Sequence, residues 1–192
     1  MQPRVNIETK RLALVLPSPS MAPRAVAFFA QNRAHLEPWE PPRPSGYYTE
    51  SWWRERLERG LREFEADLSL RLMLFWRGQP ESPVLGTVNF TSFVRGALQA
   101  CSVGYSLDRN LQGQGLMTEA LRGAIPYVFG DLGFHRISAG YLPTNERSGR
   151  VLRRLGFVVE GFARDYLYIG GAFRDHVLTA LTNPSAMAPR GL

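Results

Sequence analysis

The sequence has little that could cross-link or anchor it. A single cysteine, Cys101, excludes an intramolecular disulfide framework and a four-cysteine zinc site, and it favours a reducing compartment. No run approaches the roughly 18 apolar residues that a membrane helix requires. The longest early apolar run, from Leu12 to Leu16, is also too short for the core of a secretory signal. We therefore expect a cytoplasmic protein without a membrane span.

Histidine and lysine are also scarce. The three histidines, His35, His135 and His176, are too dispersed to indicate a metal site, so we predict no metal. Lys10 is the sole lysine, and arginine supplies the rest of the 23 basic residues, which outnumber 17 acidic residues. The excess has two open explanations: codon bias in a GC-rich genome, or affinity for an anion such as a nucleotide cofactor or ribosomal RNA. The charges are scattered and favour neither.

The chain is long enough for one domain with a substantial core. Its 192 residues are 44% hydrophobic and 21% charged, as in ordinary globular proteins. We expect a single domain over residues 1–182 and a flexible tail at 183–192, where two prolines and small residues offer little to pack.

The spacing of apolar residues predicts both strands and helices. Leu70, Leu72 and Leu74 alternate as in a strand, whereas Trp53 and Leu57 are spaced as on one face of a helix. Strands are expected within 8–16, 70–76, 84–94, 99–107, 136–141, 157–169 and 173–181, and helices at 23–36, 51–66, 116–129 and 145–155, with a proline-rich loop at 39–46. The result is an α+β domain with a mixed, mostly antiparallel central sheet of about seven strands flanked by helices.

The most informative segment is a two-glycine loop, Gln112-Gly113-Gln114-Gly115, that follows a strand and opens a helix. Unpaired backbone amides at a helix start suit a phosphate or pyrophosphate. A P-loop would need Lys and Ser or Thr where Leu116 and Met117 stand, and a dinucleotide fingerprint would need Gly or Ala at Thr118. Two interpretations remain: a pyrophosphate loop for acetyl-CoA, or a plain tight turn with both glycines at positive φ.

Within the helix, Pro126 is expected to kink or end the hydrogen-bond ladder near Arg122.

A second constellation follows about 30 residues later. Asn145 suits the N-cap of a short helix, Ser148 lies in its first turn, and Gly156 suits the position after its end. All three positions can be explained by structure alone. The order of a two-glycine loop, Asn-x-x-Ser and then Leu-Gly-Phe nevertheless resembles the GNAT acetyltransferases, in which the matching Asn hydrogen-bonds the pantetheine arm. Asn110 departs from the Gln or Arg that begins that family's loop motif.

From Thr9 to about Thr182 the chain resembles the RimJ/RimL ribosomal-protein N-acetyltransferases of the GNAT superfamily, and it is closer to the RimJ branch, which acetylates alanine. The stretches that carry the resemblance are Gln31-Asn32-Arg33, Leu36 to Pro41, Val94-Arg95-Gly96, Gly104-Tyr105-Ser106, Gln112 to Met117, Arg147-Ser148-Gly149, Arg164 to Leu167 and Arg174 to Leu181. The resemblance implies the GNAT fold, acetyl-CoA as cosubstrate, and direct attack on its thioester by the N-terminal α-amine of a ribosomal protein. The first expected acceptor is the alanine of small-subunit protein five.

The resemblance also implies roles for particular residues. It makes Glu160 the general base and Ser148 the general acid, with Tyr166 as an alternative acid. Each has a plain structural explanation too, as a strand-end carboxylate, a surface hydroxyl and a packing tyrosine. The residues expected to bind the cofactor are Tyr105, Ser106, Leu107, Gln112, Gly113, Gln114, Gly115, Leu116, Met117, Asn145 and Ser148, and those expected to bind the acceptor are Asn32, Trp39 and Tyr47.

Two alternative functions, two open questions and expectations for two further residues complete the interpretation. The acceptor could instead be a small-molecule amine, or the chain could be a non-catalytic ribosome-assembly factor that binds without turnover. The sequence leaves open whether the protein lies close to ribosomal RNA and whether it is a monomer or a dimer. Cys101 is expected to be buried and not to act as a nucleophile, because direct transfer needs no acetyl-cysteine. Glu119 is expected to support the first turns of the helix that follows the glycine loop.

Overall fold

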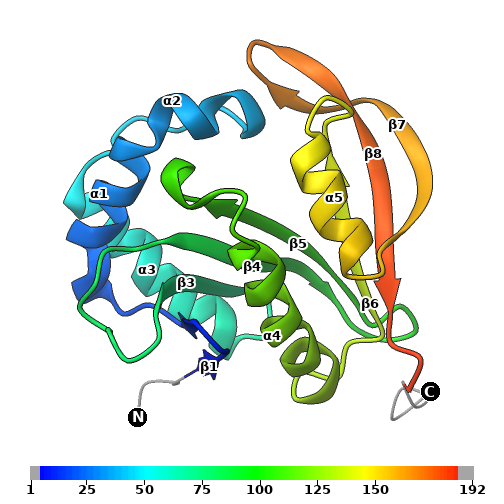
Figure 1. Ribbon diagram of the computed structural model, residues 1–192, viewed down its shortest axis with the longest axis horizontal. Helices are drawn as coiled ribbons and strands as arrows, with labels where there is room; N and C mark the ends of the chain where they lie inside the picture. The colour runs from blue at the N-terminus through cyan, green and yellow to red at the C-terminus, as the bar shows by residue number, and fades with distance from the viewer. Residues whose placement is uncertain (1–4, 186–192) are drawn as a thin grey trace.

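A computed structural model describes residues 5–185, which fold around one eight-stranded sheet (Figure 1). The order of the strands is β1-β2-β3-β4-β5-β6-β8-β7, and every neighbouring pair is antiparallel except β5 and β6. The strands are β1 (Asn6–Glu8), β2 (Leu12–Val15), β3 (Leu70–Trp76), β4 (Gly86–Val94), β5 (Ala100–Leu107), β6 (Arg136–Tyr141), β7 (Val158–Ile169) and β8 (Ala172–Thr182).

The α+β architecture and the mostly antiparallel sheet are confirmed, but the sheet has one strand more than expected. The additional strand is β1, which pairs with β2 at the sheet's edge. It has three residues, two of them the polar Asn6 and Glu8, so it has too few apolar positions to show an alternating pattern. Of the tail expected at 183–192, residues 186–192 lie outside the described part of the chain. The division into a domain and a tail stays a prediction.

Within the described part of the chain, five α-helices and three short 3₁₀ helices accompany the sheet. They are α1 (Ala22–Gln31), α2 (Arg33–Leu36), α3 (Glu50–Glu65), α4 (Leu116–Gly130), α5 (Glu146–Arg154), η1 (Pro19–Met21), η2 (Glu37–Trp39) and η3 (Arg109–Leu111). None of the helices within residues 5–185 combines the length and the apolar character that crossing a membrane would require.

The single helix expected at 23–36 is wrong, because the structure breaks it at Asn32. There the side chain's Nδ2 donates to the Phe28 carbonyl and to Asp108 Oδ2, at 3.0 Å in each case. This buried amide connects the end of α1 to the segment after β5, and the chain restarts as α2 and η2 in a new direction. Pro126 was expected to kink or end the helix near Arg122; it does not end the helix, and the kink stays a prediction. Helix α4 continues through Pro126 to Gly130, with Leu121 and Val128 buried in the core.

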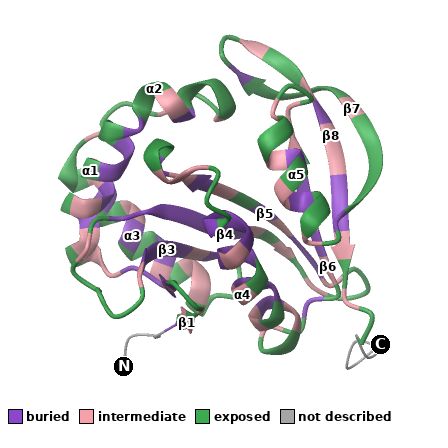
Figure 2. Cartoon of the chain, viewed as in Figure 1, coloured by how far each residue is buried: buried purple, intermediate pink, exposed green. Residues whose placement is uncertain are grey.

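Two hydrophobic clusters occupy the two faces of the sheet. Alternation along β3 explains the division, since Leu72 and Leu74 belong to the cluster that contains α4, while Met73 and Phe75 pack with α1 and α3. Figure 1 shows α4 in front of the sheet and α3 behind it. The central strands are buried, whereas β7 at the edge is exposed along most of its length (Figure 2).

The one parallel pair of the sheet is short. Strands β5 and β6 pair only from Ala100 to Ser102 against Arg136 to Ser138, and farther on they diverge. Along residues 103–107 the edge of β5 that faces β6 therefore has no strand partner within the described chain. Backbone N–H and C=O groups need partners, so this splayed edge can accept a ligand that hydrogen-bonds like a strand.

Candidate active site

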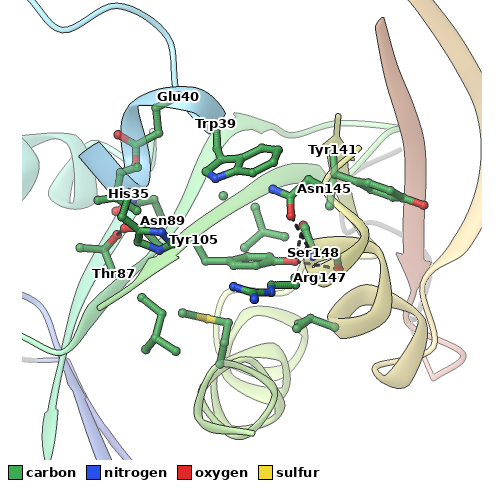
Figure 3. Close-up of a pocket in the computed structure, with 18 of the residues that line it drawn as sticks. His35, Trp39, Glu40, Thr87, Asn89, Tyr105, Tyr141, Asn145, Arg147 and Ser148 are labelled. Carbon is green, nitrogen blue, oxygen red and sulfur yellow. Dashed lines mark hydrogen bonds between the residues drawn. The ribbon is translucent and has the colours of Figure 1, made fainter. Parts of the chain in front are cut away.

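A cavity of about 1330 Å³ occupies the splay between β5 and β6. Its walls come from segments far apart in the sequence: α2 and η2 on one side, the glycine loop and the start of α4 below, and α5 opposite. Figure 3 shows Trp39 on one wall and Asn145 and Ser148 on the other, with Tyr105 of β5 between them. These segments come together only in the folded chain, so no single sequence motif predicts the cavity.

The glycine loop forms one end of the cavity. Gly113 and Gly115 have φ of 77° and 75°, in the left-handed region that favours glycine, and Gly115 is the N-cap of α4. No side chain caps this helix, so the N–H groups of its first turn are left for a ligand. A Cβ placed on Gly113 would meet no atom within 4 Å and would project into open space. The geometry fits an approaching phosphate group.

Glu119 fixes the position of this loop. Its carboxylate accepts from the Thr9 hydroxyl at 2.8 Å, the Arg11 N–H at 2.7 Å and Arg11 Nε at 2.6 Å. Burial alone would raise the pKa of Glu119, but these bonds from Thr9 and Arg11 outweigh it and lower the pKa. Arg11 Nη2 also donates to the Gln114 carbonyl at 3.1 Å. The segment before β2 therefore holds both the loop and the first turn of α4.

Tyr105 and Ser148 meet at the centre of the cavity. The Tyr105 hydroxyl and Ser148 Oγ lie 2.8 Å apart. Burial, opposed by the bond to Ser148, raises the pKa of Tyr105 to about 12, so the phenol keeps its proton at neutral pH. Asn145 caps α5 by accepting from the Ser148 N–H at 3.1 Å through Oδ1, and the described residues make no hydrogen bond to its Nδ2. A neutral hydroxyl pair and an amide thus face the same space.

Gln112 connects three walls of the cavity. Its Nε2 donates to His35 Nε2 of α2 at 2.8 Å, and its Oε1 accepts from Arg147 Nη1 of α5. His35 and Arg147 were not among the predicted site residues. They lie 77 and 35 residues from Gln112, and no local pattern connects them.

Ten of the eleven residues predicted to bind the cofactor line the cavity. The exception is Gln114, which is exposed and whose Nε2 donates to the Asn110 carbonyl at 3.3 Å. Ser106, at the edge of the splay, is buried with its Oγ 2.9 Å from Thr87 Oγ1.

The other predicted catalytic residues lie apart from the cavity. Glu160 on β7 is not part of its wall and forms an ion pair with Arg136 at the start of β6. A hydrogen bond from Arg136 is the main reason that the pKa of Glu160 is lowered. Tyr166 is 55% exposed, and its ring packs 5.3 Å from the ring of His176, which does line the cavity.

Two of the three predicted acceptor residues line the cavity. Trp39 is partly exposed there, and Tyr47 packs against Trp53 and under Arg43, whose guanidinium lies 4.7 Å from its ring centre. Burial is the main cause that raises the pKa of Tyr47. Asn32 does not line the cavity, because its side chain is fully buried and all its bonds are internal, so its contact with an acceptor stays a prediction.

Cys101 is buried, as expected, and burial raises the pKa of its thiol to about 12. A thiol with such a pKa is a poor nucleophile at neutral pH. Among residues 5–185, no group of three or more His, Cys, Asp or Glu side chains is arranged to hold a metal ion.

Comparisons with known proteins agree on one family. Residues 11–158 match the family described as "Acetyltransferase (GNAT) domain". The chain is 45% identical over 183 residues to the [ribosomal protein uS5]-alanine N-acetyltransferase of Escherichia coli K12, covering 95% of this chain and 93% of that protein.

Solved structures give the same answer. The ribosomal-protein-S5-alanine acetyltransferase of Vibrio fischeri superposes with a TM-score of 0.90 at 37% identity, covering 95% of this chain and 99% of that chain. The Mycobacterium smegmatis RimJ in complex with CoA-disulfide superposes with a TM-score of 0.85 at 26% identity, covering 93% and 86%.

Proposed function

Because the chain belongs to the GNAT acetyltransferase family, we propose that it transfers the acetyl group of acetyl-CoA to the N-terminal α-amine of a ribosomal protein, with alanine as the first residue. The acceptor is suggested by the relatives in Escherichia coli and Vibrio fischeri, whose names specify an alanine of ribosomal protein uS5 or S5. The cofactor is suggested by the relative that was solved with a CoA disulfide.

The observation that carries this proposal is that the cavity reaches both faces of the sheet at the splay. Tyr105 and Leu116 line it on the face of α4, and Met73, Thr87 and Asn89 line it on the face of α3. A cofactor entering beside the glycine loop could therefore meet an amine entering from the opposite face. Direct transfer requires such a meeting point.

The residues of the cavity fit acetyl-CoA. The uncapped start of α4 and the open space beside Gly113 suit a pyrophosphate. The unpaired edge of β5 and the amide of Asn145 suit the peptide-like pantetheine arm. When bound, acetyl-CoA would supply a thioester carbonyl and a thiol leaving group.

The chemistry demands little of the protein beyond positioning and proton supply. An N-terminal α-amine has a pKa of about 7.7–8.0, so part of it is already neutral near pH 7. Backbone N–H groups of Tyr105 to Leu107 are proposed to stabilise the developing oxyanion. Ser148 is proposed to give its proton to the departing sulfur, with the Tyr105 hydroxyl holding its Oγ in place. The amine loses a proton to solvent as the amide forms, and Ser148 regains one from solvent. The role of Glu160 as base rests on the resemblance alone and stays untested, and its position outside the cavity wall does not favour it.

An exposed aromatic side chain favours a peptide acceptor over a small amine. The cavity, of about 1330 Å³, must also hold acetyl-CoA, so its size alone does not separate these two acceptors. Trp39 is exposed at its wall and is proposed, together with Tyr47, to contact the first residues of the acceptor.

The test uses purified protein with acetyl-CoA and peptides that begin with Ala, Ser or Met. Thiol release is followed together with the mass of each peptide. We expect acetylation of the α-amine of the Ala peptide and at least tenfold less of the others. Transfer only to a small amine would overturn the peptide acceptor, and acetyl-CoA binding without turnover on intact ribosomes would favour the assembly factor.

A further inference from the structure

Two arginines form part of the cavity wall on the face of the sheet that carries α3. Arg71 alternates along β3 with Leu70 and Leu72, which pack toward α4, so its side chain lies on the opposite face. Arg56 projects from α3 toward the same place. This is the face opposite to the glycine loop, and therefore the acceptor's side of the cavity.

Positive charge is in excess at this wall. The single carboxylate of Glu63 accepts from Arg56 Nη2 and Arg71 Nε, at 3.3 Å each, and Arg59 Nε lies 3.8 Å from its other oxygen. Three guanidinium groups thus share one negative charge. Burial, followed by repulsion from Arg71, lowers the pKa of Arg56.

The other acidic side chains at the cavity are already paired. They are Glu40, which forms an ion pair with Arg43, and Glu146, which forms one with Arg150. No further carboxylate of the cavity wall is available to balance Arg56 and Arg71. An anion brought by a ligand would balance them.

The two arginines also have donors left over. Arg56 is 13% exposed, and its Nη1 is buried with no hydrogen-bond partner among residues 5–185. The hydrogen bond of Arg71 uses its Nε alone, which leaves both amino groups. A buried donor without a partner is unfavourable, so these atoms favour a ligand that accepts hydrogen bonds.

A glycine keeps this corner of the cavity open. Gly60 lies near the middle of the 16-residue α3, where glycine is unfavourable for helix stability. It lines the cavity one turn after Arg56, and a Cβ there would lie 3.8 Å from Arg56 Nη1. A longer side chain at this position would occupy the space beside the unpaired donor.

We propose that Arg56 and Arg71 bind a carboxylate of the acceptor and so make the enzyme selective for acidic N-terminal sequences. This inference rests on the proposed function and specifies its substrate class. Arg71 is in register with Asn89, which is in register with Gly104 beside the splay. Two strand spacings of about 4.8 Å separate Arg71 from the splay, and an extended peptide covers that distance in about three residues. The carboxylate therefore belongs to a side chain at position two, three or four.

The experiment compares amidated hexapeptides that begin with Ala and carry one Glu at position two, three, four or five, each against the same peptide with Gln. We expect kcat/KM to be about tenfold higher for Glu at one of positions two to four, as a charge-assisted hydrogen bond would give. Arg71→Gln is expected to remove this preference, so that the Glu and Gln peptides have kcat/KM values within about twofold of each other. Arg59→Gln is the matched control, because Arg59 also pairs with Glu63 but is 57% exposed and does not line the cavity.

Binding of labelled peptides in the presence of CoA, measured by fluorescence anisotropy, separates the two proposals. Transfer to the Ala peptides without any preference for Glu would overturn the carboxylate site and keep the proposed function. The opposite result is that Glu peptides bind more tightly than Gln peptides, that Arg71→Gln abolishes this difference, and that no peptide is acetylated. It would keep the site and overturn the proposed function. An equal loss for Glu and Gln peptides in Arg71→Gln would also overturn the site. Alanyl dipeptides with free and amidated ends test whether a chain-terminal carboxylate is used instead.

Discussion

At the scale of single residues, the centre of the cavity is a pair of hydroxyl groups with protons to give. Tyr105 cannot ionise near neutral pH, because burial raises its pKa to about 12. Its hydroxyl lies 2.8 Å from Ser148 Oγ, and Asn145 fixes the backbone of Ser148 from the other side. These two neighbours orient Ser148 as a proton donor requires, because a donor must first lie within hydrogen-bond reach of the atom that receives its proton.

We predict that Ser148→Ala lowers kcat by about 100-fold, the lower range for losing a positioned proton donor. Tyr105→Phe should lower it by about three- to tenfold, because a single hydrogen bond is lost. If Tyr105 acts only through Ser148, the double variant should be no slower than Ser148→Ala. Steady-state kinetics, with acetyl-CoA affinity from calorimetry as the control, measure this. Additive losses in the double variant would show that Tyr105 acts by itself.

The role of Glu160 as general base is a residue-level prediction that rests on resemblance alone. Its ion pair with Arg136 and its position outside the cavity wall favour a structural role. We therefore expect Glu160→Gln to change kcat/KM by less than about threefold and to leave its pH profile unaltered, since surface pairs contribute little. A loss of two orders of magnitude, together with loss of the rise of rate with pH, would instead establish the base that the resemblance implies.

At the scale of elements, the cavity depends on two backbone features. One is the divergence of β5 from β6 after Ser102, and the other is the left-handed conformation of Gly113 and Gly115 before α4. Both leave N–H groups without partners in the same cavity, so cofactor binding is expected to depend on backbone shape more than on side chains.

We predict that Gly113→Ala raises KM for acetyl-CoA by about tenfold or more, because its Cβ enters the open space where a phosphate would bind. Gly96→Ala is the matched control, since Gly96 also has a positive φ, 69°, and open space around it, but does not line the cavity. Both variants should lose about 1 kcal/mol of stability from the left-handed conformation, and only Gly113→Ala should affect KM. Equal KM values in the two would contradict a phosphate site at the loop.

Local sequence was sufficient for most of the elements and for one wall of the site, but it missed β1 and the break at Asn32 and was insufficient for contacts between walls. The strand at Leu70, Leu72 and Leu74 and the loop before α4 were both predicted, because each has a local pattern in the sequence. The contact of Tyr105 with Ser148 joins residues 43 apart and exists only because β5 and β6 diverge. The bond between Asn32 and Asp108 could not be predicted for the same reason, since the two residues are 76 positions apart.

At the scale of the whole molecule, one carboxylate connects the beginning of the chain to the helix that opens the cavity. Glu119 on α4 is bound by Thr9 and Arg11, 110 and 108 residues earlier. Its side chain is 18% exposed, so these bonds are partly shielded from water. Because these bonds join segments that are distant in the sequence, they contribute to the stability of the whole fold.

The pH dependence of folding stability follows from this carboxylate. Because hydrogen bonds from Thr9 and Arg11 lower its folded pKa below the ordinary value of 4.5, the charged form is the one that stabilises the fold. Its contribution is therefore complete above about pH 4.5 and is lost as the pH falls through the lower, folded pKa. We predict that Glu119→Gln lowers the free energy of unfolding by about 1–2 kcal/mol at pH 7, equivalent to a Tm roughly 2–8 °C lower.

The difference between the two proteins should shrink as the pH approaches 3, because the native side chain then becomes neutral as well. Scanning calorimetry from pH 7 to pH 3 measures it. Glu50→Gln is the control: Glu50 forms an exposed pair with Arg54 within one helix, worth no more than about 0.5 kcal/mol. A Glu119→Gln deficit that stays constant down to pH 3 would mean that the loss of an acceptor oxygen, and not the loss of charge, explains the effect.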